Sequence, residues 1–332
     1  MRAWLMDSMN GVEALRLGQV ADPRPGPGET LLRVRVAALN PADAFLAQGL
    51  YPAHPHLPHV LGRDGVGDVL DVGPGVDNAL VGETVGILRG DVGIESWGTL
   101  AEKVLVPMEN LARIPQGWSL EEMAGAPLVL LTAYQALTQW NEPAAAPRPQ
   151  SVLLVTGASG GVGIAAVLLG KSMGLTVVAL SRSEEKRSRL RALGADCVYD
   201  PGDRNLVDAI KKAIGPRRVD IVVDSVGGAL LHQVIAVVGY GGRISIVGRS
   251  GGPVPEFNTA SLLFRRIRMG GVAVGDYKAK EAQAVWNEIV DRLNALGRRP
   301  VVDSVVPFEE VKAAFARLAQ GSMGKVLVRV AE

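Results

Sequence analysis

The chain has 332 residues, of which 48% are hydrophobic and 5% aromatic, and its 35 Lys and Arg nearly balance 34 Asp and Glu. This balance argues against nucleic acid or an anionic membrane as partner and favours a small-molecule substrate. The only cysteine, Cys197, excludes an internal disulfide and a multi-thiolate metal site. A single cysteine and the lack of a membrane-length apolar run predict a cytoplasmic protein. The length allows two domains with separate cores.

The N-terminal part of the chain has the pattern of a β domain. Short apolar segments bounded by Gly, Pro and Asp predict strands over residues 29–38, 66–72, 83–88 and 99–106. Segments of this kind are typical of an antiparallel, partly barrel-like sheet. We expect this domain to cover residues 1–123.

A strand, a glycine turn and a helix follow one another from residue 152. The apolar run Val152–Val155 precedes the sequence TGASGGVG at residues 156–163, and a helical pattern follows. Glycines allow a tight turn and close approach of a pyrophosphate, while a helix start offers unpaired N–H groups. This segment therefore predicts a dinucleotide-phosphate site. Its predicted cofactor-binding residues are Gly157, Ser159, Gly160, Gly161, Val162 and Gly163.

Strand and helix patterns then alternate with short connections. Strands are predicted over residues 176–181, 196–199, 219–224 and 243–247, and helices over 183–193, 205–214 and 229–238. This alternation predicts an α/β fold, a doubly wound parallel Rossmann sheet, over residues 124–271. Ser225 and Val226 follow one strand and Gly248 follows the next, at the strand ends where such sheets bind ligands. We predict these three residues as cofactor contacts. The Pro/Ala-rich residues 141–149 predict a surface loop.

The last part of the chain breaks the alternating pattern. Helices are predicted over residues 279–296 and 308–319, and strands over 302–306 and 326–330. We expect residues 272–332 to return to the first domain, so that the Rossmann domain is inserted in the chain. Residues 269–272 predict the last strand of the parallel sheet, and such an edge strand favours pairing across a twofold axis in a homodimer.

The end of the second strand indicates which dinucleotide binds. A carboxylate about twenty residues beyond the glycines would bind the ribose 2′-hydroxyl of NAD. This chain has Ser181 and Arg182 there, and Lys186 one turn into the next helix, a set suited to the 2′-phosphate of NADP(H). Two alternatives stay open. Arg182 and Lys186 could be solvated residues of a helix start, and Glu184 could serve NAD rather than compensate the helix dipole.

Several motifs together resemble one family. They are NPAD at residues 40–43, QGLYP at 48–52, LGRDGVG at 61–67, the glycine turn, DSVGG at 224–228 and GKVLV at 324–328. Over the whole chain they resemble the medium-chain dehydrogenase/reductase superfamily, in its zinc-independent quinone oxidoreductase and enoyl thioester reductase branch. The resemblance implies a GroES-like β domain holding an inserted Rossmann domain, and a dimer. The chain departs from the quinone oxidoreductase pattern at Leu168, where that family usually has Gln.

The resemblance also bears on zinc. The alcohol dehydrogenase branch has a Cys where this chain has Asn40 and a His where it has Arg63, and an amide and a cation do not replace them as ligands. Residues 86–115 contain no cysteine for a structural zinc lobe. We therefore expect no metal. An alternative is the cluster of His54, His56 and His59, although its prolines favour an exposed loop.

Without a metal, hydrogen-bond donors must stabilise the oxyanion that forms when a conjugated carbonyl or a quinone accepts hydride. Tyr51 and Asn40 are the predicted catalytic residues. In the enoyl reductase branch a Tyr in the matching Tyr-Pro context donates a proton or orients substrate. Alternatively, Tyr51 packs against prolines and Asn40 is a turn residue. Arg63 either pairs with Asp43 or Asp64, or faces an acidic substrate group.

The resemblance places Thr132 in the helix beneath the nicotinamide, so it is predicted as a cofactor contact; alternatively, it bonds the backbone of its own helix.

We expect an NADPH-dependent, zinc-free reductase of quinones or α,β-unsaturated carbonyls. Three alternatives are an enoyl thioester reductase, a metal-assisted alcohol dehydrogenase, and an NADPH-binding protein with little turnover.

Overall fold

The computed structural model describes residues 1–140, 149–253 and 258–331. Most of the predicted Pro/Ala-rich loop, residues 141–148, lies outside them. The chain forms two compact units. The first unit comprises Met1–Leu128, Tyr277–Asn287 and Arg299–Glu332, and the second comprises Val129–Asp276 and Glu288–Arg298.

The second unit is built on a six-stranded sheet with the order β11-β10-β9-β12-β13-β14. Its strands are β9 (Val152–Val155), β10 (Thr176–Leu180), β11 (Cys197–Tyr199), β12 (Val219–Asp224), β13 (Val238–Ile246) and β14 (Arg268–Gly271). All neighbouring pairs are parallel. The order reverses between β9 and β12, and a crevice at the carboxyl ends of such strands is where open α/β sheets bind ligands. The predicted fold class is confirmed.

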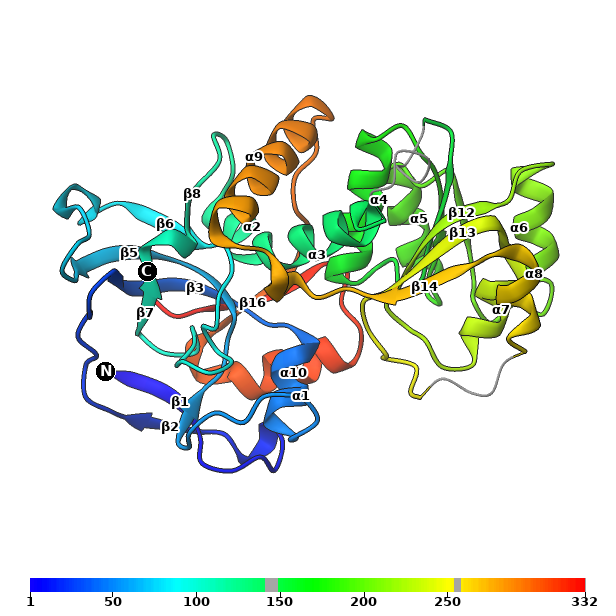
Figure 1. Ribbon diagram of the computed structural model, residues 1–332. Coiled ribbons are helices and arrows are strands. Elements are labelled where there is room, and N and C mark those ends of the chain that lie inside the picture. The colour runs from blue at the N-terminus through cyan, green and yellow to red at the C-terminus, as the bar shows by residue number, and fades with distance from the viewer. Residues whose placement is uncertain (141–148, 254–257, 332) are drawn as a thin grey trace. The chain divides into compact units, whose positions relative to one another are not determined.

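Helices cover both faces of this sheet (Figure 1). They are α3 (Pro127–Thr138, from Val129 on), α4 (Gly161–Ser172), α5 (Glu184–Ala192), α6 (Leu206–Ile214), α7 (Leu230–Val237) and α8 (Ala260–Arg265), with the 3-10 helix η4 (Val274–Asp276). Right-handed crossovers place α4 and α5 on one face and α7 and α8 on the other. Fully buried residues such as Leu154, Val222 and Ile244 form the core between sheet and helices.

One strand of this sheet is longer than expected. The sequence predicts a strand from residue 243, whereas β13 begins at Val238, directly after α7. Gly241 has a φ of +72°, a conformation that residues with side chains rarely adopt. It lies inside β13, between Val238 and Arg243, where the pairing with β12 shifts register.

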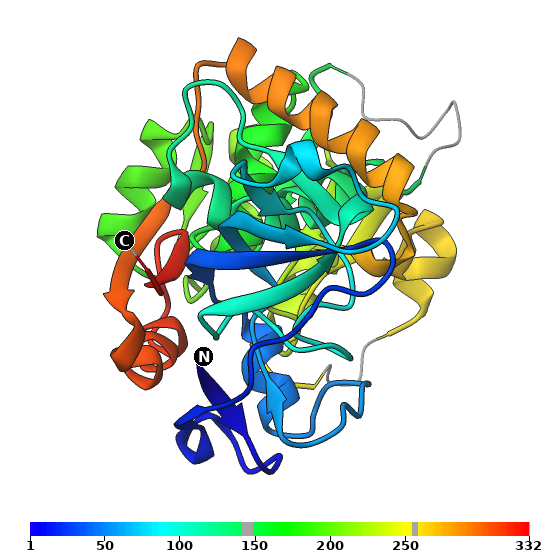
Figure 2. The same ribbon diagram turned by 90° about the vertical axis from the view of Figure 1, so that its left-hand side faces the viewer.

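The first unit contains two sheets. A seven-stranded sheet has the order β15-β16-β3-β5-β6-β8 with β7 also on β3, and a three-stranded sheet has the order β2-β1-β4. The strands are β1 (Arg2–Met6), β2 (Arg16–Gln19), β3 (Glu29–Ala38), β4 (His59–Val60), β5 (Asp64–Val72), β6 (Thr84–Ile87), β7 (Lys103–Pro107), β8 (Leu111–Arg113), β15 (Val302–Pro307) and β16 (Lys325–Arg329). Figure 2 shows β3 in blue beside β7 in teal. Because β16 pairs with β3, the end of the chain joins the sheet of the N-terminal segment.

The helices of the first unit surround these sheets. They are α1 (Pro41–Ala47), α2 (Leu120–Gly125), α9 (Ala279–Ala295, as far as Asn287) and α10 (Val311–Ala319), with the 3-10 helices η1 (Val12–Ala14), η2 (Asn78–Leu80), η3 (Met108–Asn110) and η5 (Phe308–Glu310). Trp4 donates its indole N–H to the carbonyl of Phe308 at 2.8 Å inside the core. In the described part of the chain, no helix combines the length and the apolar character needed to cross a membrane.

The strand predicted over residues 99–106 begins only at Lys103. The preceding residues bond a loop instead, because the amides of Thr99 and Leu100 donate to the carbonyls of Gly62 and Leu61. This pairing holds the segment containing Arg63 and Asp64 against the sheet.

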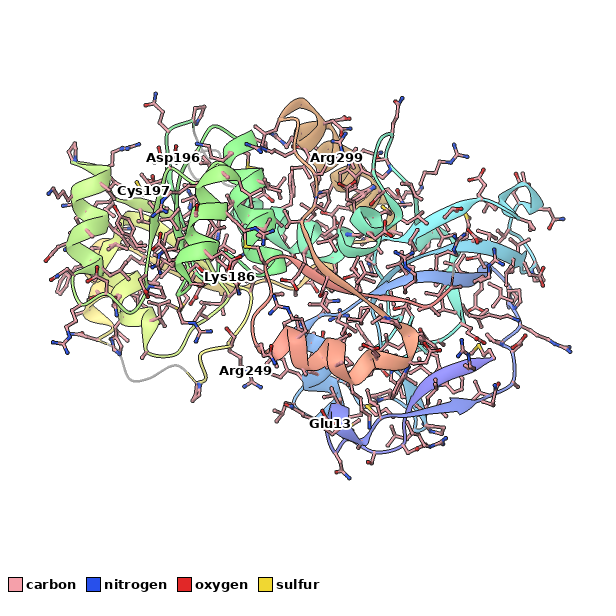
Figure 3. All side chains as sticks on the ribbon, turned by 180° about the vertical axis from the view of Figure 1, so that it is seen from behind. Glu13, Lys186, Asp196, Cys197, Arg249 and Arg299 are labelled. Carbon is pink, nitrogen blue, oxygen red and sulfur yellow. The ribbon has the colours of Figure 1, made fainter. Side chains whose placement is uncertain are left out.

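The cysteine Cys197 begins β11 and lies beside Asp196, as Figure 3 shows. Burial, and then the charge of Asp196, raise the pKa of the Cys197 thiol. A thiol whose pKa is raised is a poor nucleophile at neutral pH. The Asp196 carboxylate itself accepts from the Lys171 ammonium at 2.8 Å.

Candidate functional site

The predicted glycine turn links β9 to α4 in the second unit. Gly157 has a left-handed φ of +57°, and Gly160 is the N-cap of α4 with no side-chain cap bond. A Cβ on Gly163 would lie 2.3 Å from the carbonyl oxygen of Gly157 and 2.6 Å from Cα of Ala158. The turn therefore lies too close to the helix for any side chain at Gly163. As at any helix start, the first backbone N–H groups of α4, at Gly161, Val162 and Gly163, have no partners inside the helix.

A buried carboxylate ties β9 to β12 where the strand order reverses. The hydroxyl of Thr156 donates to Asp224 Oδ1 at 2.5 Å and accepts from the amide of Ser225 at 3.0 Å. The amides of Val226 and Gly227 also donate to Asp224 Oδ1, at 3.0 and 3.1 Å. Neither Thr156 nor Asp224 is among the residues predicted from the sequence, where the only signal is a polar residue at the end of each strand. The pair fixes the loop that carries Ser225 and Val226.

The loop after β12 packs against the loop after β13. A Cβ on Gly248 would lie 2.9 Å from the carbonyl oxygen of Ser225, and the amide of Gly251 donates to the carbonyl of Val226 at 2.7 Å. The hydroxyl oxygen of Ser225 is buried and has no hydrogen-bond partner within the described structure. Thus the predicted residues Ser225, Val226 and Gly248 lie together, and one of them has unused hydrogen-bonding capacity.

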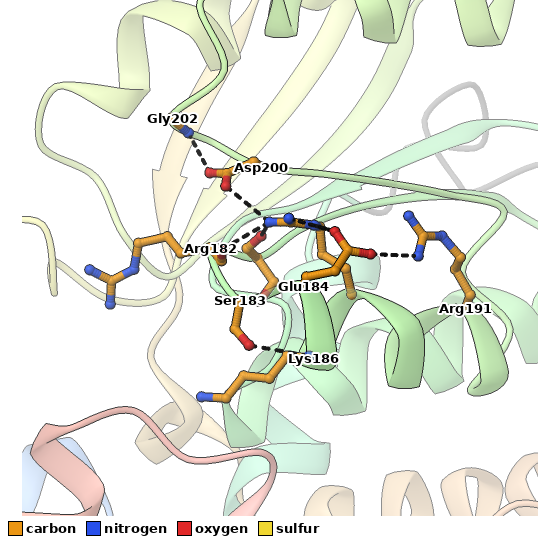
Figure 4. A network of polar contacts seen from close by, with 9 residues as sticks. Arg182, Ser183, Glu184, Lys186, Arg191, Asp200 and Gly202 are labelled. Atoms are coloured by element: carbon orange, nitrogen blue, oxygen red, sulfur yellow. Dashed lines mark hydrogen bonds and ion pairs between the residues drawn. The ribbon is translucent and has the colours of Figure 1, made fainter.

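The predicted 2′-phosphate residues lie after β10 and in the first turn of α5 (Figure 4). Ser181 is buried, Arg182 is exposed, and Ser183 is the N-cap of α5, accepting from the amide of Lys186 at 3.4 Å. Figure 4 shows the side chains of Arg182 and Lys186 extending away from the carboxylates of the network.

Glu184 is engaged by its own helix. Arg187 donates to Glu184 Oε2 from Nε at 3.0 Å and from a terminal nitrogen at 2.6 Å, and Arg191 reaches Oε1 at 3.5 Å. These bonds lower the pKa of the Glu184 carboxyl, and the bond from Arg187 has the largest effect. Arg187 was not singled out from the sequence, since one arginine among several in a charged helix carries no distinguishing pattern. Thr132, the remaining predicted cofactor residue, is half-buried on α3.

In the first unit, Asn40 belongs to a buried ionic cluster. The ammonium of Lys325 donates to Asn40 Oδ1 at 2.6 Å and lies 3.0 Å from Asp64 Oδ2. The amide nitrogen of Asn40 donates to Asp64 Oδ2 at 2.9 Å and weakly to the carbonyl of Ala38 at 3.5 Å. Lys325, Asp64 and Asn40 are 5%, 1% and 4% exposed. We call these three residues the Lys325 cluster; sequence analysis missed Asp64 and Lys325 as members.

The Lys325 cluster also holds the start of α3. Asp64 Oδ1 accepts from the amide of Leu128 at 3.3 Å, in the first turn of that helix. A carboxylate at a helix N-terminus satisfies an unpaired N–H and compensates the dipole. Asp64 therefore connects β5, β16 and the first turn of α3 through one side chain.

Asp43 lies in the first turn of α1 and is fully buried. Its Oδ2 accepts from the amide of Asn40 at 2.8 Å, whereas its Oδ1 is buried with no partner in the described residues. Burial raises the pKa of Asp43 to about 6, against the opposing charges of Arg63 and Lys325. The carboxyl group therefore titrates near neutral pH.

Arg63 contacts Tyr51. A terminal nitrogen of Arg63 donates to the Tyr51 hydroxyl oxygen at 3.2 Å, and Cζ of Arg63 lies 5.5 Å from the centre of the Tyr51 ring. The predicted pairing of Arg63 with Asp43 or Asp64 is wrong: among the described residues the Arg63 side chain donates to Tyr51 and acts on Asp43 through its charge alone. The other alternative, an acidic substrate group, stays a prediction. Because the tyrosine oxygen accepts this bond, its own proton stays available for another acceptor.

The three histidines of the alternative metal site do not face one another. His54 and His56 are exposed, while His59 is completely buried in β4. Within residues 1–140, 149–253 and 258–331, no group of three or more His, Cys, Asp or Glu side chains is arranged to hold a metal ion.

Comparisons with known proteins agree with this architecture. Residues 26–116 match the family described as alcohol dehydrogenase GroES-like domain, and residues 161–294 match the family described as zinc-binding dehydrogenase. The synaptic vesicle membrane protein VAT-1 homolog of Homo sapiens is 32% identical over 99% of this chain and 86% of its own length. The chain belongs to the medium-chain dehydrogenase/reductase superfamily. It falls in the branch of that superfamily that contains quinone oxidoreductases and VAT-1 homologues.

Solved structures of this superfamily are similar over their whole length. An NAD-dependent alcohol dehydrogenase has a TM-score of 0.88 and 31% identity, with all of both chains covered. The quinone oxidoreductase of Thermus thermophilus, also solved in complex with NADPH, has a TM-score of 0.79 and 32% identity, covering 99% of this chain and 100% of its own. The protein is thus an NAD(P)-dependent oxidoreductase related to quinone oxidoreductases.

Proposed function

We propose that this dehydrogenase/reductase is an NADPH-dependent, zinc-free reductase that transfers hydride to a quinone or an α,β-unsaturated carbonyl compound. The observation that carries the proposal is the contact between Arg63 and the Tyr51 hydroxyl. A cation bonded to the oxygen of a phenol makes its O–H a stronger donor. Such a donor suits an acceptor whose oxygen becomes negatively charged during reduction.

The residues of the second unit fit a dinucleotide. Gly163 has no room for a Cβ, and the Ser225 hydroxyl is buried without a partner among the described residues, as expected for a group reserved for a ligand. The turn from Gly157 to Gly163 would bind the pyrophosphate, and Ser181, Arg182 and Lys186 the 2′-phosphate. When bound, NADPH supplies the hydride. The relative from Thermus thermophilus, solved with NADPH, supports this cofactor.

The Lys325 cluster does not fit a catalytic zinc. Zinc sites use thiolate, imidazole and carboxylate ligands, and the carboxylate here, Asp64, already bonds an ammonium at 3.0 Å and an amide at 2.9 Å. Arg63, the residue before Asp64 in the chain, adds a second cation. Residues 161–294 match a family described as zinc-binding dehydrogenase, but the described residues contain no set of side chains arranged as zinc ligands.

We assign different roles to the two predicted catalytic residues. Tyr51 is the proposed donor to the substrate oxygen, held by Arg63. For Asn40 we replace the expected donor role by a positioning role, because its amide hydrogens go to Asp64 and to the carbonyl of Ala38. Asn40 starts α1 and, through its backbone amide, also holds Asp43.

The test is a screen of NADPH oxidation with 1,4-benzoquinone, a simple enone and a trans-2-enoyl thioester as acceptors. We expect turnover with the quinone or the enone, unchanged by a zinc chelator. Tight NADPH binding without turnover of any acceptor would show that the protein binds NADPH but is not a reductase of these compounds. Preference for the thioester would make it an enoyl thioester reductase. Loss of activity with the chelator would overturn the zinc-free proposal.

A substitution tests the role of Tyr51. Tyr51→Phe removes the hydroxyl and should lower kcat about a hundredfold while leaving NADPH affinity unchanged. The matched control is Tyr240→Phe, because Tyr240 is 71% exposed on β13. Equal kcat values for the two variants would reduce Tyr51 to a packing residue.

A further inference from the structure

Arg187 occupies the centre of a polar network at the proposed 2′-phosphate site. One terminal nitrogen of Arg187 donates to the carbonyl oxygens of Ser181 at 2.8 Å and Arg182 at 2.9 Å, and to Asp200 Oδ2 at 3.0 Å. Its other nitrogens bond Glu184 Oε2 at 3.0 and 2.6 Å. Figure 4 shows this network from close by, with its two carboxylates Glu184 and Asp200 labelled.

The network combines two carboxylates with one well-packed cation. The Arg187 side chain is 14% exposed, whereas Glu184 is 71% and Asp200 41% exposed. Asp200 follows β11 and also accepts from the amide of Gly202 at 2.8 Å. The bond to Glu184, and then that to Asp200, raise the pKa of Arg187, whose guanidinium is charged as in any arginine. Glu184 and Asp200 thus each form an ion pair with Arg187.

These carboxylates lie where the choice between NAD and NADP is made. An acidic group at the end of the second strand of a dinucleotide fold binds the ribose hydroxyls of NAD and repels the 2′-phosphate of NADP. Glu184 and Asp200 both reach the guanidinium that bonds the backbone of Ser181 and Arg182, directly after β10. Without Arg187, two negative charges would stand beside the proposed phosphate site.

We propose that Arg187 is a specificity-determining residue for NADPH that acts without having to touch the phosphate. It neutralises Glu184 and Asp200, and it fixes the carbonyls of Ser181 and Arg182 so that this turn keeps the shape shown in Figure 4. In that shape the Arg182 side chain is exposed and points away from the carboxylates. The inference rests on the proposed use of NADPH.

Arg187→Met tests this role, because methionine keeps the length but removes the charge and the donors. Calorimetric titration with 2′,5′-ADP and with 5′-AMP isolates the 2′-phosphate, and titration with NADPH and NADH repeats the test on whole cofactors. We expect the preference for 2′,5′-ADP over 5′-AMP to fall roughly ten- to hundredfold, the range for one charge-assisted interaction. Arg191→Met is the matched control, since Arg191 is 51% exposed and lies 3.5 Å from Glu184; its preference should change less than about threefold.

A second substitution separates charge from shape. Glu184→Gln in the Arg187→Met background should restore part of the preference, because one unneutralised carboxylate is gone. Glu184→Gln alone, which keeps Arg187, should retain or increase the preference and remains informative if Arg187→Met does not fold. A decrease with Glu184→Gln alone, an unchanged preference with Arg187→Met, or an equal loss with Arg191→Met would overturn the inference. Failure of the cofactor proposal is distinct: the wild-type protein itself would then not prefer 2′,5′-ADP.

Discussion

The glycine turn of the second unit and the Lys325 cluster of the first unit form candidate sites in opposite ways. The turn uses backbone groups from one contiguous segment, and its tightest requirement is the absence of a side chain at Gly163. The cluster uses charged and amide side chains from α1, β5 and β16, buried together. We therefore expect the glycine turn to be disrupted when a side chain is added, and the Lys325 cluster to be destabilised when one of its charges is removed.

The largest effect is expected from Lys325→Met, which leaves Asp64 buried without its cation. Breaking a buried ion pair by removing one partner costs about 3–5 kcal/mol, because the remaining charge is neither solvated nor paired. The free energy of unfolding in urea measures this loss. Asp64→Asn added to Lys325→Met should recover much of it. The control is Lys312→Met, a surface lysine that donates to the carbonyl of Glu13, with an expected loss below about 1 kcal/mol. Equal losses for the two lysine variants would show that the cluster is not held by charge.

The next effect tests the turn. Gly163→Ala places a Cβ 2.3 Å from the carbonyl oxygen of Gly157, so the turn or α4 must shift. We expect a loss of about 2 kcal/mol in the free energy of unfolding and weaker NADPH binding, since overpacking typically costs about 1–3 kcal/mol. Gly275→Ala is the control, because a Cβ there meets nothing within 4 Å and no positive φ is required. NADPH binding at wild-type strength in Gly163→Ala would show that the turn does not depend on this close approach.

The same contrast explains what could be predicted from sequence. The strand, turn and helix around Gly157 are contiguous in the chain, so the local pattern and the glycine spacing are sufficient to predict them. The bounds of β3 and β12 also agree with the predicted ones. Asp64 and Lys325 are 261 residues apart in the chain and meet because β3 pairs with both β5 and β16. No local pattern encodes that meeting. Arg187 was missed for another reason: its partners, the carbonyls after β10 and Asp200 after β11, become neighbours only in the sheet.

The buried carboxyl group of Asp43 in the first unit should make the stability of the protein depend on pH. The pKa of Asp43 is raised from 3.8 to about 6 by burial, so the folded protein holds this proton more tightly than the unfolded chain does. The stability contributed by the protonated group is complete below about pH 4 and is lost as the pH rises through about 6. Relative to Asp43→Asn, the wild-type protein should therefore lose at most about 3 kcal/mol between pH 4 and pH 7, at about 1.4 kcal/mol per pKa unit.

Unfolding of both proteins in urea across this pH range measures the difference, with the exposed Asp71→Asn as control. A difference between wild type and Asp43→Asn that is independent of pH would show that Asp43 is not titrating near neutral pH.

The smallest effect concerns a polar side chain in the otherwise backbone-based site of the second unit. The Ser225 hydroxyl is buried and has no partner in the described part of the chain, so Ser225→Ala removes no bond from the ligand-free protein. Its free energy of unfolding should change by less than about 0.5 kcal/mol, or increase slightly, because a buried unpaired polar group is unfavourable. If the hydroxyl is reserved for the cofactor, NADPH affinity should fall about three- to tenfold, the value of one neutral hydrogen bond. Calorimetry of NADPH binding and urea unfolding, on the same preparations, measure the two quantities. A loss of stability without loss of affinity would mean that Ser225 supports the loop between β12 and α7 rather than the ligand, and that the second unit binds through its backbone alone.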